Sequence, residues 1–162
     1  MDLACLVVLL GALAWSTVTD LRRRAIPNGC ALAVALSGLA LGAAEGVPAR
    51  SLAGGLVALA VLLLAAWASA RRAGAPGVGG GDVKLLSALG LWLGPVTGLV
   101  AVALSCLLGV VGWALAVGAR RLWRRSEGES PCEDPAGLGI PMAPAIALAA
   151  LLALPARMGA IG

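Results

Sequence analysis

The sequence predicts an all-α fold, a polytopic membrane helix bundle of about six transmembrane helices with the N-terminus outside. Hydrophobic residues make up 60% of the 162 residues, and only 12% are charged. A soluble domain carries about twice that charged fraction. The mean hydropathy is +0.99, and apolar runs recur along the whole chain. A bilayer solvates such runs as helices, so we expect a single membrane-embedded domain over residues 1–162.

The first three apolar runs predict helices at about 3–19, 28–44 and 51–70. No basic segment precedes the first run and "DLRRR" follows it, which indicates an uncleaved helix with an external N-terminus. Pro27 can open the second helix, because proline is well tolerated at the first helical position. The third run ends at Arg71-Arg72.

The next apolar stretch, 85–117, is too long for one span. As a single helix its 33 residues would measure about 50 Å, against a hydrocarbon core of about 30 Å. Gly94-Pro95 offers a break, which predicts helices at about 83–94 and 96–118. A polar cytoplasmic loop is predicted at 126–139, followed by a last helix at about 140–155.

The basic residues support six helices. Only Arg50 and Arg157 then fall on the outer side, and the others gather on one side as the positive-inside rule requires. These are Arg22, Arg23, Arg24, Arg71, Arg72, Lys84, Arg120, Arg121, Arg124 and Arg125. This distribution accounts for the net charge of +4 without nucleic acid as a partner. We expect the protein to be embedded in the lipid bilayer.

The residue types present limit the chemistry. Histidine is absent, and the four cysteines form no CxxC pair. We therefore expect no metal site, no disulfide framework and no cofactor. Catalysis would have to use carboxylates, thiols, hydroxyls or a lysine.

Two carboxylates, Asp20 and Asp82, stand next to helices at membrane depth, both at the cytoplasmic side of the predicted topology. Acids at such depth indicate a functional site. Separately, Asp82 could be a helix N-cap, and Asp20 an interfacial residue neutralised by neighbouring arginines. As a close pair they would share one proton and could activate water. Helix dipoles would favour Asp82, at a helix N-terminus, as the anion.

The residues before Asp82 exceed what a cap needs. Gly79, Gly80 and Gly81 strip side-chain bulk from the backbone, so that an extended substrate could approach the carboxylate closely.

Three motifs occur in order along the chain: "DLRRRAIPN" around Asp20, "GGGDVKLLSALG" around Asp82, and "IPMAPAIALA" before the last apolar run ends. Together they resemble the prepilin peptidases, the membrane aspartyl proteases with a GxGD motif: the second contains GxGD with its usual continuation, the first is similar to the segment around the other aspartate, and the third resembles the start of the last helix. The resemblance implies an aspartic endopeptidase with catalytic Asp20 and Asp82. It would cleave the leader of a type IV prepilin or pseudopilin precursor at the cytoplasmic face of the cell inner membrane.

The chain is similar to the short form associated with Flp/Tad pili. Nothing in it corresponds to the cytoplasmic domain that goes with N-methylation in longer members. The alternative to a protease is a function of another class, a small ion-coupled transporter or secretion-system membrane subunit. Such a protein would use the same aspartates as an ion or proton site.

Three further residues are candidates for shaping the site or binding substrate. Asn28 could bond the substrate or Asp20, and Lys84 could act on the carboxylates or contact a substrate carbonyl. Pro27 fixes the turn before Asn28. The alternatives are a purely structural "IPN" turn and an interfacial lysine that extends towards water.

Overall fold

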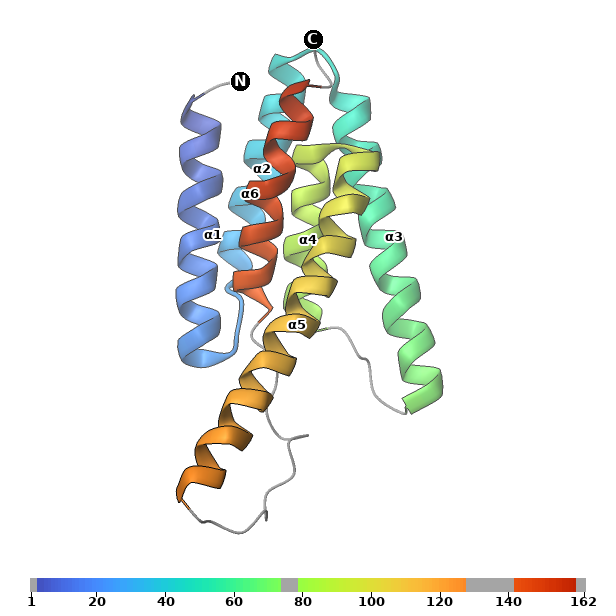
Figure 1. The fold of residues 1–162 in the computed structure, drawn as a ribbon. Coiled ribbons are helices and arrows are strands. Elements are labelled where there is room, and N and C mark those ends of the chain that lie inside the picture. The colour runs from blue at the N-terminus through green and yellow to red at the C-terminus, as the bar shows by residue number, and fades with distance from the viewer. Residues whose placement is uncertain (1–2, 74–78, 128–141, 160–162) are drawn as a thin grey trace.

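The computed structural model describes residues 3–73, 79–127 and 142–159. Within these ranges the chain forms six helices and no strands, as predicted (Figure 1). The helices are α1 (Leu3–Arg23), α2 (Asn28–Ala44), α3 (Pro48–Ala73), α4 (Gly80–Leu93), α5 (Pro95–Glu127) and α6 (Ala143–Gly159).

Three of the described helices are long and apolar enough to cross a membrane. The candidate spans are Leu3–Arg23, Pro48–Arg72 and Pro95–Ala119. Large apolar side chains cover the outside of these helices, including Leu3, Leu64, Val96 and Leu115, each more than half exposed. Since an outer surface of this kind is stable in lipid rather than in water, the protein is a membrane protein.

Helix α4 lies at the centre of the bundle, in contact with α2, α3, α5 and α6. Most of its side chains are buried, from Val83 through Leu93. The indole of Trp92 is almost fully buried and donates to the carbonyl of Val34 and the hydroxyl of Ser37, both at 3.0 Å. These bonds fix α4 against α2, because a buried polar group without a partner would be destabilising.

The crossing of α3 and α4 depends on glycines, which have no side chain. A Cβ added at Gly54 would lie 2.6 Å from the Cα of Gly94, and one added at Gly90 would lie 3.0 Å from the Cβ of Ala58. Small residues let two helices approach at backbone distance, which is a common way to join helices in membranes.

The predicted break between the fourth and fifth helices is present. Helix α4 ends at Leu93, Gly94 adopts a φ of +78°, and α5 begins at Pro95. Glycine tolerates this backbone conformation, and proline fits the first position of the next helix.

Several helix bounds differ from the predicted ones. Helix α3 includes Pro48 and continues to Ala73, because proline fits a first turn and the polar residues beyond a span still form helix. Helix α5 also continues past its predicted end, to Glu127, because the polar residues beyond the span still form helix. Only residues 126 and 127 of the predicted polar loop 126–139 are described, and both are in α5. Residues 128–141, including the predicted start of the last helix at 140, lie outside the described residues.

The fourth helix differs in a way that matters for the site. It begins at Gly80 rather than at residue 83, and Gly79 is its N-cap. Asp82 is therefore the third helical residue and not the cap. Gly80 and Gly81 are helical because the residues after them are almost all buried, and their packing stabilises the helix.

One end of the bundle brings distant segments together. In Figure 1 the last turns of α1 and α3 and the first turns of α4 and α6 lie at the same, lower end. The ends of α1 and α3 carry Arg22, Arg23, Arg71 and Arg72. Asp20 and Asp82 lie at this end too, on α1 and α4.

Candidate active site

Asp20 lies on the buried face of α1. Leu9, Leu13, Ser16 and Asp20 follow each other at helical spacing, and these are the buried residues of the helix. The Asp20 side chain is only 7% exposed. Its Oδ2 accepts a hydrogen bond of 2.9 Å from the backbone N–H of Ala143. A buried carboxylate requires such a partner.

The Asp20 contact joins two ends of the chain. Ala143 is the first residue of α6, so the carboxylate of α1 satisfies one of the free N–H groups at the α6 N-terminus. A helix N-terminus also stabilises negative charge. Sequence reasoning missed this partner, because a backbone N–H carries no sequence signature.

Asp82 lies in the first turn of α4 and is partly exposed. Its carboxylate turns back and accepts a hydrogen bond from the backbone N–H of Gly79, the N-cap residue. An acidic side chain at the third helical position commonly closes a helix start in this way. Thus Asp82 combines a structural bond with an accessible carboxylate.

The two carboxylates lie within electrostatic range, and the negative charge of Asp20 acts on Asp82. Each also lies at a helix N-terminus, Asp20 at α6 and Asp82 at α4. The dipole argument that favoured Asp82 as the anion therefore no longer separates the two residues. Both N-termini offset the repulsion between the carboxylates.

Each glycine of "GGGD" has a different environment. A Cβ at Gly79 would lie 2.8 Å from Oδ2 of Asp82, and one at Gly81 would lie 3.1 Å from the Cβ of Ile26. At Gly80 no atom of the residues that the structure describes lies within 4 Å of an added Cβ. Gly79 therefore leaves room for the Asp82 carboxylate, and Gly81 leaves room for the "IPN" segment. Only Gly80 faces open space.

Lys84 and Asn28 contact each other instead of the carboxylates. The Nζ of Lys84 donates a hydrogen bond of 3.0 Å to Oδ1 of Asn28, the first residue of α2. Pro27 is the N-cap of α2, with φ −63° and ψ 133°. Because Lys84 lies about 200° around α4 from Asp82, its side chain points away from the pair.

Another side chain near the pair was not singled out from the sequence. Cys106 of α5 is exposed and within electrostatic range of Asp82. In residues 3–73, 79–127 and 142–159 no three His, Cys, Asp or Glu side chains are grouped so that they could hold a metal ion.

The fold and the site define a helical membrane protein with two interacting carboxylates at one end of its bundle. The model of the type IV leader peptidase family matches residues 7–114, more than half of the chain and including both aspartates. The chain therefore belongs to the type IV leader peptidase family, whose members are proteases of the prepilin leader type. Neither the curated proteins nor the solved structures give a significant match.

Proposed function

We propose that the protein is an intramembrane aspartic endopeptidase that removes the leader of type IV prepilin-like precursors, with Asp20 and Asp82 as the catalytic pair. The observation that supports this proposal is that the carboxylates of Asp20 on α1 and Asp82 on α4 lie within electrostatic range of each other. Family membership supports the protease class and the prepilin-type substrate.

The chemistry needs one shared proton. The ionised carboxylate takes a proton from water while the water oxygen bonds to the peptide carbonyl carbon. The protonated carboxyl stabilises the resulting oxyanion and then gives its proton to the departing amine nitrogen, as the C–N bond breaks. The pair again holds one proton, with the two roles exchanged.

The two carboxylates have different surroundings. Asp20 is buried and held by the Ala143 N–H, whereas Asp82 is partly exposed and can meet water and substrate. We assign the shared proton to the pair and not to one residue.

We infer that the active site lies at the cytoplasmic face of the inner membrane. The ends of α1 and α3 carry pairs of arginines on the same side of the bundle as the carboxylates. By the positive-inside rule this side remains in the cytoplasm, where an unprocessed leader would be found.

The test is a co-expression cleavage assay with Asp20→Asn and Asp82→Asn, each made alone. Each variant should process the precursor at least about 10²-fold more slowly, the range for loss of a general acid or base, while still inserting in the membrane. Glu45→Gln, in the α2–α3 turn at the other end, is the matched control and should process normally. Normal processing by either Asp variant would refute the paired mechanism.

A further inference from the structure

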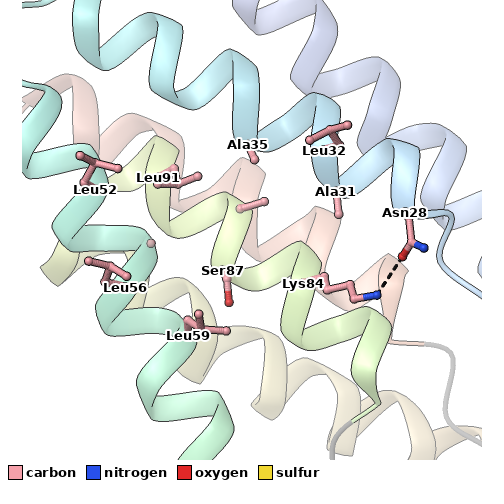
Figure 2. A pocket seen from close by; sticks show the side chains of 12 residues that line it. Asn28, Ala31, Leu32, Ala35, Leu52, Leu56, Leu59, Lys84, Ser87 and Leu91 are labelled. Atoms are coloured by element: carbon pink, nitrogen blue, oxygen red, sulfur yellow. Dashed lines mark hydrogen bonds between the residues drawn. The ribbon is translucent and has the colours of Figure 1, made fainter.

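A groove on the outside of the bundle lies between α2, α3 and α4 (Figure 2). It has a volume of about 580 Å³. Its lining includes four small residues, Ala31, Ala35, Gly55 and Ala88. Leu32 and Leu56 also line it, and both are more than half exposed. Small residues with exposed leucines beside them suit the close approach of another apolar helix.

The polar end of the groove lies at the start of α4, the helix that also carries Asp82. Among the described residues that line the groove, Lys84 is the only charged one, and its described bond is to the neutral Asn28 (Figure 2). Its positive charge is therefore not neutralised by that partner. The third polar lining residue, Ser87, uses its hydroxyl to donate to the carbonyl of Val83. An occupant should consequently be apolar along the groove and offer carbonyl oxygens at the Lys84 end.

The start of α4 connects the groove with the carboxylates. Lys84 lines the groove, Asp82 lies within electrostatic range of Asp20 on α1, and the glycine segment 79–81 lies just before both. The first N–H groups of a helix have no intrahelical acceptor. In the described part of the chain, no atom lies within 4 Å of a Cβ added at Gly80. An extended peptide that leaves the groove at Lys84 can therefore pass over Gly80 and reach Asp82.

We propose that this groove binds the apolar helix of the precursor, so that the peptide preceding that helix crosses Gly80 and enters the Asp20–Asp82 site. The inference rests on the proposed function and names the substrate-binding surface for it. Lys84 and Asn28 bind carbonyl oxygens of the precursor at the boundary between its extended segment and its helix.

The first test fills the groove. Ala35→Phe places a ring in it, whereas Ala40→Phe changes an exposed position of α2 that does not line it. Ala35→Phe should raise the KM for the precursor about tenfold, the effect of losing one leucine-sized apolar contact, with kcat little changed. Ala40→Phe should leave KM unchanged. An equal KM for both variants would overturn the proposal.

The second test does not need catalysis. A photo-reactive benzoylphenylalanine replaces Leu56 in the groove or, as control, Leu107 on α5; the two leucines are 65% and 60% exposed. Both substitutions are made in Asp82→Asn protein, so that the precursor stays intact. Cross-linking to the precursor should be strong from position 56 and weak from position 107. Equal yields, or cross-links from position 56 only to lipid or a second copy, would contradict the proposal.

The two tests separate this inference from the proposed function. Processing that survives in Asp20→Asn would reject the aspartic mechanism, but cross-linking at position 56 would still identify the groove. Conversely, loss of processing in both Asp variants without cross-linking at position 56 would retain the mechanism and reject the groove.

Discussion

At the residue scale, the position of Asp82 depends on the absence of a side chain at Gly79. The Asp82 carboxylate accepts a hydrogen bond from the Gly79 N–H, and a Cβ added at Gly79 would lie only 2.8 Å from its Oδ2. The first glycine of "GGGD" thus permits the carboxylate position, and the third permits contact with Ile26. This explains two of the three glycines by packing.

Gly79→Ala should therefore reduce kcat strongly. The added methyl group would displace the Asp82 carboxylate, and a shift of about 1 Å in a reacting group can cost about 10²-fold in rate. Gly80→Ala should cause a smaller loss, because its Cβ would meet no atom of the described residues within 4 Å. Steady-state cleavage of a purified precursor measures both.

Gly11→Ala is the control for general effects of alanine. Gly11 lies in α1, also with nothing within 4 Å of an added Cβ, and alanine favours helix there. Its kcat should equal that of the unaltered protein. Equal losses in Gly79→Ala and Gly80→Ala would contradict the assigned role of Gly79.

At the scale of elements, α4 is the helix on which the site depends. It presents Asp82 at its first turn, and its far end is fixed by Trp92 against α2 and by the Gly54–Gly90 crossing against α3. The neighbouring helices stabilise α4, which has only 14 residues. Its position should be sensitive to any change at these contacts.

Gly54→Ala should destabilise the bundle. The new methyl group would meet backbone atoms of Gly94, which cannot move aside as a flexible side chain can. Overpacking of this kind typically costs about 1–3 kcal/mol. Denaturation in mixed micelles, followed by circular dichroism, measures the free energy of unfolding.

Gly112→Ala on α5 is the matched control, since nothing lies within 4 Å of its added Cβ. It should be neutral or slightly stabilising, by up to about 1 kcal/mol. A free energy of unfolding that falls equally in both variants would show that the α3–α4 crossing is not tight.

The sequence predicts the elements better than their contacts. Apolar runs, arginine clusters and Gly94-Pro95 suffice for six helices, because each signal is local. The start of α4 was missed by three residues, since glycine is a poor helix former and packing of the later turns overrides that preference. The pairing of Asp20 with the Ala143 N–H spans 123 positions and depends on how α6 docks.

The site residues divide in the same way. Asp20 and Asp82 stand out because acids are rare in apolar helices, and their closeness follows from the helix directions. The partners of Lys84 and Asn28 could not be read from the sequence, because both residues could have faced the pair. Their position around α4 and α2 decides that they contact each other.

At the scale of the whole molecule, the account requires one orientation in the membrane. The carboxylates and the arginines of α1 and α3 share one end of the bundle, and Arg50 lies near the other, at the start of α3. We predict that the first end faces the cytoplasm and that the N-terminus is outside.

Single cysteines in an otherwise cysteine-free protein test this orientation. In intact spheroplasts a membrane-impermeant maleimide should label Arg50→Cys but not Arg23→Cys or Arg71→Cys. The latter two should react only after the membrane is opened. Labelling of the Arg23 and Arg71 variants from outside would reverse the orientation and remove the argument for a cytoplasmic active site.

The central claim is that Asp20 and Asp82 meet at one end of the bundle. The most direct measurement is cross-linking of Asp20→Cys/Asp82→Cys with a short bifunctional thiol reagent, in a cysteine-free chain with a protease site inserted at Gly46. After proteolysis the two fragments should stay covalently joined, and those of the control pair Asp20→Cys/Arg50→Cys should separate. Separation of the fragments in both pairs, with the reagent shown to reach each cysteine, would contradict the account.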